Sequence, residues 1–260
     1  MLTEIYEKSP LCYFDGNVWR DYHCWRTHTT SKAILVCGGP SLNKIDLSKL
    51  KGPGKTIFGV NNTYPKVVPD YWIGMDFPEC YDGDIYFEPF PKIMRGGYQK
   101  YSIHGKGLQH YKNLFFCRTT TEPKPSESIF NSLSPLCKEF YWSKDVFSMS
   151  LQLIMHQGFK EIFIAGCDLS IEEQDYHTNQ ILSDENKEKN QALYNKLFEF
   201  LGWFKELALM NGVYVYSTSP DSKINKVLKY VSLEEINKSI FIPKTDKELL
   251  HVSEVEKSAK

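Results

Sequence analysis

The sequence lacks any pair of cysteines spaced as C-x-x-C, although it contains seven cysteines among its 260 residues. An odd number of widely spaced cysteines indicates neither a zinc site nor a disulfide framework. Cys37 and Cys167 lie at the ends of apolar runs, and we expect both to be small buried thiols.

An excess of charge of one sign is also missing. The 31 basic residues nearly balance the 32 acidic ones, and the formal net charge is −1. This balance excludes a global basic field that would hold nucleic acid by neutralising phosphates. No apolar run approaches the ~20 residues that span a bilayer, and the first residues do not have the basic-then-apolar layout of a signal peptide. We therefore expect a cytoplasmic protein without a membrane span.

The usual nucleotide-binding fingerprints are absent. The segment Gly38–Ser41 (GGPS) does not extend to the G-x-G-x-x-G pattern of dinucleotide-binding proteins. The segment 51–56 (KGPGKT) resembles the end of a Walker A loop, but the pattern requires glycine at position 49, where the sequence has Lys49. Asp82 and Asp84 imitate a D-x-D metal clamp, but Asp and Gly are also the commonest turn residues. We interpret the last two segments as turns and predict no metal ligands.

What the sequence does contain is a series of apolar runs that alternate with helical patterns. Runs typical of buried strands occupy residues 33–37, 56–62, 70–76, 112–117, 161–168 and 212–219. Amphipathic helices are predicted over residues 145–158 and 184–212, and each ends on a glycine. This alternation predicts an α/β protein with a Rossmann-like, doubly wound, mostly parallel sheet.

The domain organisation follows from the same pattern. Residues 1–32 are polar and aromatic without a clear period, and we expect an irregular N-terminal arm. Residues 33–243 are predicted to form one Rossmann-like nucleotide-binding catalytic domain. Within it, residues 77–135 are rich in Pro, Gly, Tyr and Asp and predict a loop-rich insertion after the carboxyl end of a strand. The charged tail, 244–260, is expected to fray.

Polar residues follow the predicted strands at their carboxyl ends. Ligands bind at this edge of open α/β sheets, so these residues are the candidate site. They are Gly38, Gly39, Pro40, Ser41, Asn61, Asn62, Asp76, Asp168 and Ser217. The glycines allow close approach of a ligand to the backbone, and Ser41 could cap a helix whose N–H groups face an anion. A plain tight turn explains the same segment equally well. The two asparagines offer four donors that suit a sugar or a base.

His177 lies in a polar segment after the predicted strand at 161–168. An imidazole titrates near pH ~6.5 and can accept a proton from a hydroxyl at neutral pH. The alternative is a histidine that is simply solvated.

These residues resemble a known family. The segments ILVCGGPSLNKIDLSKL, GVNNTYP and GFKEIFIAGCDLS, with DYH behind the last, resemble the bacterial sialyltransferases of glycosyltransferase family 42. They also resemble the wider group with a methanopterin-pyrophosphokinase-like domain, which includes motility-associated factors thought to glycosylate flagellin. The similarity covers roughly residues 33–220.

The resemblance implies a glycosyltransferase that uses a nucleotide-sugar donor, with a CMP-sugar favoured and a UDP-sugar possible. The first bend would hold the nucleotide, with Gly38 at the position of a family asparagine. Asn61 matches a family asparagine, Asp76 replaces another, and the helix-start serine corresponds loosely to Ser148 or Ser150. The family's general base falls near His177, and Asp76 is the second expected catalytic residue, which would orient the sugar and ribose with Asn61 and Asn62. The departing monophosphate would be stabilised by glycine and helix N–H groups. Because a monophosphate carries less charge than a diphosphate, no metal is obligatory, although Mg²⁺ is possible.

Three alternatives stay open. One is an ATP-dependent diphosphokinase of the pterin type, with Mg²⁺ held by Asp76 and Asp168. A second is a non-catalytic nucleotide- or sugar-binding module. A third is a phage-type DNA-base glycosyltransferase, for which the candidate basic strip lies within residues 92–106: Lys92, Arg95, Lys100 and Lys106, interleaved with Tyr98, Tyr101 and His104. We interpret this strip as a solvated loop. Expected partners are the nucleotide-sugar donor and a glycan, glycoprotein or DNA acceptor, and an oligomer is possible.

Overall fold

The computed structural model describes residues 9–27, 32–121, 132–142, 144–171, 175–177, 180–181 and 183–238. The predicted charged tail, 244–260, lies outside the described residues. No helix within the described ranges is both long enough and apolar enough to cross a bilayer.

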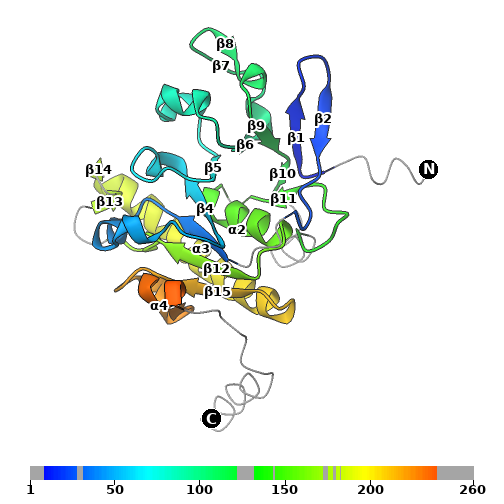
Figure 1. Ribbon diagram of the computed structural model, residues 1–260. Helices are drawn as coiled ribbons and strands as arrows, with labels where there is room; N and C mark the ends of the chain where they lie inside the picture. The colour runs from blue at the N-terminus through cyan, green and yellow to red at the C-terminus, as the bar shows by residue number, and fades with distance from the viewer. Residues whose placement is uncertain are drawn as a thin grey trace.

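A ten-stranded sheet forms the centre of the molecule, in the order β16-β15-β12-β3-β4-β5-β6-β9-β1-β2 (Figure 1). Its first eight strands are parallel: β16 (Lys229–Tyr230), β15 (Tyr214–Ser217), β12 (Glu161–Ala165), β3 (Lys32–Val36), β4 (Lys55–Val60), β5 (Tyr71–Gly74), β6 (Lys92–Arg95) and β9 (Leu114–Cys117). β1 (Leu11–Phe14) pairs antiparallel with β9, and β2 (Trp19–Tyr22) pairs antiparallel with β1. The predicted α/β, Rossmann-like, mostly parallel fold is confirmed.

The six strands predicted from apolar runs are present; five are shorter than predicted, and β3 is shifted by one residue. Both predicted helices are present as α2 (Val146–His156) and α3 (Asp184–Met210). The sequence pattern did not predict β6, which has the sequence KIMR within a Pro- and Gly-rich stretch. Its first residue, Lys92, is fully buried, and a lysine does not indicate a buried strand.

The described part of the N-terminal arm is regular, and the expectation of an irregular arm is wrong for it. Residues 9–27 contain the β1–β2 hairpin, which extends the sheet beyond β9. The guanidinium of Arg118 binds both the carboxylate of Asp21 and the carbonyl of Ser9. The rings of Tyr22 and Phe115 also pack with centroids 4.6 Å apart. These contacts join segments about a hundred residues apart, so no local sequence pattern could indicate them.

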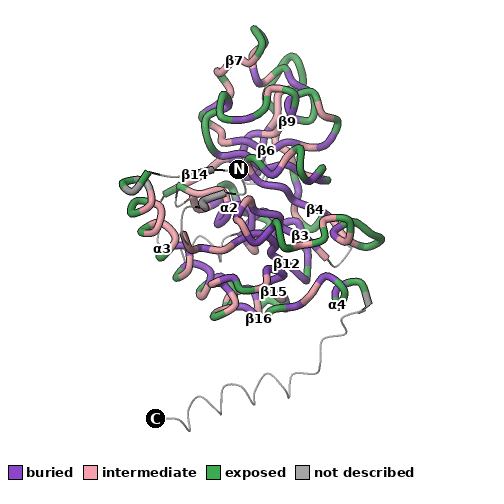
Figure 2. Tube along the Cα trace, turned by 90° about the vertical axis from the view of Figure 1, so that its left-hand side faces the viewer, coloured by how far each residue is buried: buried purple, intermediate pink, exposed green. Residues whose placement is uncertain are grey.

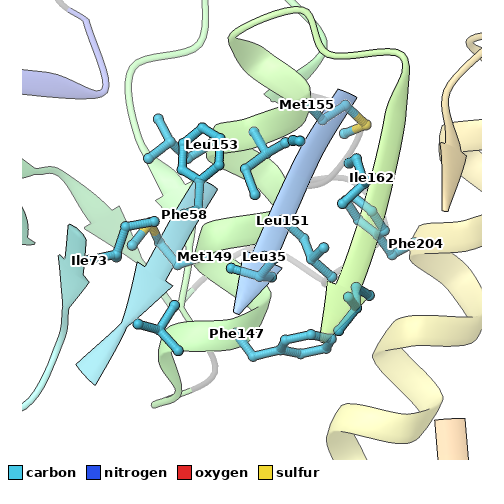
Figure 3. Packing of buried hydrophobic residues seen from close by; sticks show 14 of the residues in the cluster. Leu35, Phe58, Ile73, Phe147, Met149, Leu151, Leu153, Met155, Ile162 and Phe204 are labelled. Atoms are coloured by element: carbon cyan, nitrogen blue, oxygen red, sulfur yellow. The ribbon is translucent and has the colours of Figure 1, made fainter. Parts of the chain in front are cut away.

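Helices cover the sheet unequally. On one face, α2 and α3 pack against inward side chains such as Leu35 and Ile162 (Figure 3). On the other face, Ile34 and Phe163 pack against short 3-10 helices and α4 (Leu233–Lys238). Adjacent residues of β3 and β12 therefore face opposite layers, as the two-residue period of a strand requires. Figure 2 shows that burial is concentrated along these central strands and α2.

Short 3-10 helices connect many of the strands. They are η2 (Pro40–Lys44), η3 (Leu47–Lys49), η4 (Asn61–Thr63), η5 (Pro78–Cys80), η6 (Gly83–Phe87), η7 (Gly96–Tyr98), η8 (Leu108–His110) and η9 (Lys223–Lys226). Three small strand pairs lie outside the main sheet: β7 (Ser102–Ile103) with β8 (Lys106–Gly107), β10 (Thr119–Thr120) with β11 (Phe140–Tyr141), and β13 (Asp175–His177) with β14 (Gln180–Ile181).

The described part of the predicted insertion, residues 77–121 and 132–135, is more than a loop. It supplies two strands of the main sheet, β6 and β9, and an aromatic cluster that includes Tyr81, Tyr86 and Phe116. Lys92 is buried under this cluster, and its Nζ donates to the carbonyls of Glu88 and Phe90 at 2.5 and 3.0 Å. The expectation that the basic strip is a solvated loop is therefore wrong for Lys92. Without it, the basic residues of the strip are Arg95, Lys100 and Lys106.

Candidate functional site

The candidate site lies where the chain reverses its direction of travel across the sheet. From β3 the chain proceeds through β4, β5, β6 and β9 on one side. It then returns to β12, on the other side of β3, and continues to β15 and β16. Ligands of doubly wound folds bind in the crevice outside the carboxyl ends of the strands at such a point.

A cavity of about 540 Å³ is present at this point. Its lining comes from the ends of β3, β4, β5 and β12 and from α2 and α3: Cys37, Gly38, Gly39, Pro40, Val60, Asn61, Asn62, Asp76, Lys144, Asp145, Val146, Phe147, Gly166, Cys167, Asp168, Leu169, Ser170, Asn190, Leu193, Tyr194 and Leu197. The structure thus brings together seven of the predicted site residues: Gly38, Gly39, Pro40, Asn61, Asn62, Asp76 and Asp168.

The bend after β3 is packed tightly against the end of β12. The N–H of Gly39 donates to the carbonyl of Gly166 at 2.7 Å. A Cβ at position 39 would lie 2.6 Å from that carbonyl oxygen and 2.6 Å from Oδ2 of Asp168. Gly166 has φ +69, and a Cβ there would lie 2.2 Å from the carbonyl oxygen of Cys37. Both glycines are therefore required by the close approach of the two strand ends.

Asp168 caps the helix that begins at the bend. Its Oδ2 accepts a hydrogen bond from the N–H of Ser41 at 2.9 Å. Ser41 is buried, and its Oγ has no hydrogen-bond partner within the described residues. The backbone N–H of Ser41, which was expected to face an anion, is thus hydrogen-bonded to a carboxylate of the protein itself. The phosphate-binding role of Ser41 stays a prediction.

A second network lies across the cavity, where β4 and β5 end. Nδ2 of Asn61 donates to Oδ2 of Asp76 at 3.1 Å, and Oδ1 of Asn61 accepts from the hydroxyl of Tyr81 at 3.1 Å. The same hydroxyl accepts from the N–H of Asp76 at 2.7 Å. Burial raises the pKa of Tyr81, so the phenol stays protonated near neutral pH and can serve as both donor and acceptor. Asn61 adopts φ +46, a left-handed conformation that asparagine tolerates better than most residues.

Four predicted binding residues do not line the cavity: Ser41 and three further serines. Ser148, Ser150 and Ser217 are fully buried. Oγ of Ser148 donates to Oδ2 of Asp145 at 2.7 Å, and Oγ of Ser150 donates to the carbonyl of Val146 at 2.7 Å. The predicted contacts of these serines with a donor stay predictions. In this structure the hydroxyls of the three fully buried serines form hydrogen bonds within the protein, at the start of α2 and just after β15.

Sequence reasoning missed several residues of the cavity wall. Asp145 caps α2 by accepting from the N–H of Ser148 at 2.6 Å, and Lys144 precedes it with φ +67. Asn190 and Tyr194 project from α3, one helical turn apart. The spacing of Asn190 and Tyr194 was a usable signal, because residues four apart share one face of a helix. The apolar pattern of α3 indicates only which face of the helix its leucines occupy, and it does not indicate these two residues.

The two predicted buried thiols, Cys37 and Cys167, are buried and line the cavity. A hydrogen bond with the Cys37 thiol and burial raise the pKa of Cys167 well above its ordinary value. This thiol is therefore protonated near neutral pH and contributes as a small apolar group.

His177 ends β13, whose backbone lies against η2, the helix that follows the glycine bend. The strand is therefore on the same side of the sheet as the bend. The side chain of His177 lies outside what the structure describes, so its role as general base stays a prediction.

The site shows no preformed metal cage within the described residues, where no three His, Cys, Asp or Glu side chains come together to hold an ion. Asp76 and Asp168 both line the cavity but belong to separate networks, one with Asn61 and the other with Ser41.

Comparison with known proteins gives likeness at the level of structure. No protein-family model matches the sequence, and no curated protein matches it significantly. Similar solved structures include the sialyltransferase CstII from Campylobacter jejuni in complex with cytidine-5′-monophosphate, with 13% identity, a TM-score of 0.48, and coverage of 84% of this chain and 92% of that one. Another is the monofunctional α-2,3-sialyltransferase Cst-I from Campylobacter jejuni, with 12% identity, a TM-score of 0.45, and coverage of 95% and 98%. At such identities the likeness concerns the fold.

Proposed function

We propose that the chain is a glycosyltransferase that moves a sugar from a CMP-sugar donor to a hydroxyl of a saccharide acceptor. One observation carries the proposal. The motifs that resemble family 42, at the ends of β3, β4 and β12, converge on one cavity at the topological switch point. Its volume of about 540 Å³ lies within the ~300–1,000 Å³ that is typical of small-molecule sites.

The charges of the cavity favour a donor with a single phosphate. Among the described residues, three carboxylates line it, those of Asp76, Asp145 and Asp168, against one ammonium group, that of Lys144. Each carboxylate repels a phosphate oxygen, and the repulsion grows with the number of phosphate charges. A monophosphate linked to a sugar therefore suits this lining better than the polyphosphate of ATP.

The chain's own groups would divide the work. The side-chain amides of Asn61 and Asn62 offer donors and acceptors for the ribose, the base or the transferred sugar. The backbone at Gly38 lets the phosphate approach without a side chain in between. As the bond between the sugar's anomeric carbon and the phosphate oxygen breaks, the acceptor oxygen forms the new bond and His177 takes its proton.

Nucleotide binding tests the donor class. CMP is the nucleotide named for several of the similar solved structures, and it is the first ligand to try. We expect CMP to raise the melting temperature more than UDP does, and ATP with Mg²⁺ to have the smallest effect. Stabilisation by ATP with Mg²⁺ alone would replace the proposal by the diphosphokinase, in which Asp76 and Asp168 hold the metal. Retention of transfer in EDTA would support a reaction that needs no metal.

Replacement of the proposed base tests the chemistry. His177→Ala is expected to abolish transfer and to leave CMP binding intact. His23→Ala is the matched control, because His23 is exposed on the segment that follows β2. If His177→Ala retains full turnover, the histidine is not the base. If it binds CMP normally but is inactive at every pH, the assignment gains support.

A further inference from the structure

Arg95, the last residue of β6, has a guanidinium that is stacked rather than paired. Its Cζ lies 3.8 Å from the ring centroid of Trp142 and 5.9 Å from that of Tyr98. Within the described ranges, no carboxylate forms an ion pair with it and no acceptor takes a hydrogen bond from it. A guanidinium carries five N–H donors in a fixed fork, so half-buried Arg95 presents donors that no described group uses.

Trp142 adds a second unused donor at the same place. Its Nε1 is buried and has no hydrogen-bond partner within the described residues. The residue is held in position by its backbone, since its N–H donates to the carbonyl of Thr120 at 2.9 Å. A buried N–H without an acceptor is costly, and such groups in native proteins call for an explanation.

The Arg95–Trp142 patch, defined as Arg95, Trp142, Tyr98 and Phe77, adjoins the cavity along two segments. On one side, Phe77 follows Asp76 of the cavity wall, is 55% exposed, and packs against Tyr98 with ring centroids 5.6 Å apart. On the other side, Trp142 precedes Lys144 and Asp145 of the cavity wall by two and three residues. Phe77 and Trp142, which contact Tyr98 and Arg95, are thus one to three residues along the chain from the cavity wall.

We propose that this patch is the acceptor subsite and that it takes a saccharide bearing a carboxylate. The inference rests on the proposed function, because it assigns the acceptor of that reaction. The two oxygens of a carboxylate can accept from the guanidinium fork of Arg95, and the indole N–H of Trp142, which is buried in this structure, can join them after a local side-chain rearrangement. The C–H face of the sugar ring can pack on Phe77, beside the carboxylate of Asp76 that can accept from sugar hydroxyls.

A nucleic-acid acceptor fits the patch less well. A protein that tracks a phosphate backbone needs several cations in a row. Here Lys92 is buried and bonded to carbonyl groups, and Lys106 stacks on Tyr111 with its Nζ 4.7 Å from the ring centroid. A single guanidinium beside an indole donor matches one carboxylate.

The indole signals of the five tryptophans give a site-specific readout in ¹H–¹⁵N NMR spectra. The Trp142 signal is assigned by its loss in Trp142→Phe. We expect methyl glucuronide to shift this signal and methyl glucoside to leave it in place. Arg95→Gln should weaken glucuronide binding about tenfold. Arg95→Lys should have an affinity between those of the wild type and Arg95→Gln, because lysine keeps the charge but lacks the forked N–H donors of the guanidinium. Lys106→Gln is the control for the same change of charge and should bind like the wild type.

Several outcomes would overturn the subsite. These are no shift with methyl glucuronide, an equal response to inorganic phosphate or glucose 6-phosphate, unchanged binding in Arg95→Gln, or tighter binding of a single-stranded oligonucleotide. CMP stabilisation is measured on the same samples, so the two proposals fail separately. CMP binding without a glucuronide shift removes the subsite alone. A glucuronide shift without CMP binding retains a carboxylate site and removes the transferase.

Discussion

The carboxylate of Asp168 accepts a hydrogen bond from the backbone N–H of Ser41 at 2.9 Å, across the boundary between the two halves of the sheet. Asp168 follows β12 and Ser41 follows β3, so this bond joins the two strand ends at which the chain reverses direction. The same carboxylate lines the cavity. It therefore stabilises the bend and places a negative charge where the nucleotide phosphate is proposed to bind.

Two substitutions separate these effects. Asp168→Asn keeps an oxygen that can accept from Ser41 and removes the charge, so we expect a loss of about 1 kcal/mol or less in the free energy of unfolding. Asp168→Ala leaves the buried N–H without its partner and should cost about 1–3 kcal/mol. CMP affinity should rise severalfold in Asp168→Asn, because one repulsive charge is gone. Urea unfolding and calorimetric titration measure the two quantities. A fall in CMP affinity for Asp168→Asn would mean that the carboxylate contacts the ligand directly.

Gly39→Ala tests how closely the bend must approach β12. The added Cβ would lie 2.6 Å from both Oδ2 of Asp168 and the carbonyl oxygen of Gly166. Relief of this overlap requires the bend to move, and we expect a loss of about 1–3 kcal/mol in the free energy of unfolding and weaker CMP binding. Gly97→Ala is the control, because a Cβ there meets nothing within 4 Å. It should be neutral or stabilising by up to about 1 kcal/mol. Equal stability of the two variants would contradict the packing argument.

Tyr81→Phe tests whether the second network supports ligand binding. The substitution removes a hydroxyl that accepts from the N–H of Asp76 and donates to Asn61. We expect a loss of about 1–2 kcal/mol in stability and a drop in CMP affinity, because Asn61 is no longer held in place. Tyr86→Phe is the matched control. Tyr86 is buried and donates to the carbonyl of Pro78 at 2.8 Å, away from the cavity. It should lose similar stability and bind CMP normally. A similar loss of affinity in both variants would indicate a general loosening of the aromatic cluster.

The fold and part of the site could be predicted because local signals and topology agreed. Buried parallel strands have continuous apolar sequences, and their carboxyl ends meet at one edge of the sheet. Gly38, Asn61, Asp76 and Asp168 could therefore be grouped without knowledge of the strand order. The sequence predicts which residues form the site but not what each of them does, because the roles of His177 and the other site residues depend on ligand contacts.

Other features could not be predicted, for identifiable reasons. The β1–β2 hairpin depends on the distant Arg118, and β6 begins with a buried lysine. Ser148 and Ser150 lie on α2, where every residue from Phe147 to His156 is buried, so the sequence does not reveal which face meets the cavity. The bond between Asp168 and Ser41 joins two segments that the sequence separates by 127 positions.

The buried lysine gives a pH-dependent prediction. Burial lowers the pKa of Lys92 from 10.5 to about 8. Below about pH 8 both the folded and the unfolded chain hold the proton, and the cost of burying the charge is fully present. Between about pH 8 and 10.5 the unfolded chain binds more protons than the folded one, so the contribution of Lys92 to stability rises with pH, by about 1.4 kcal/mol per pH unit.

Buried thiols such as Cys24 and Cys137, whose pKa burial raises to about 12, act in the opposite sense above their ordinary value of 9.0. The wild type is therefore compared with Lys92→Met, in which these thiols are unchanged. Urea unfolding of both proteins at several pH values should show that the free energy of unfolding of the wild type rises relative to that of the variant between about pH 8.5 and 10. A constant difference over this range would mean that the ammonium group is solvated in the folded protein.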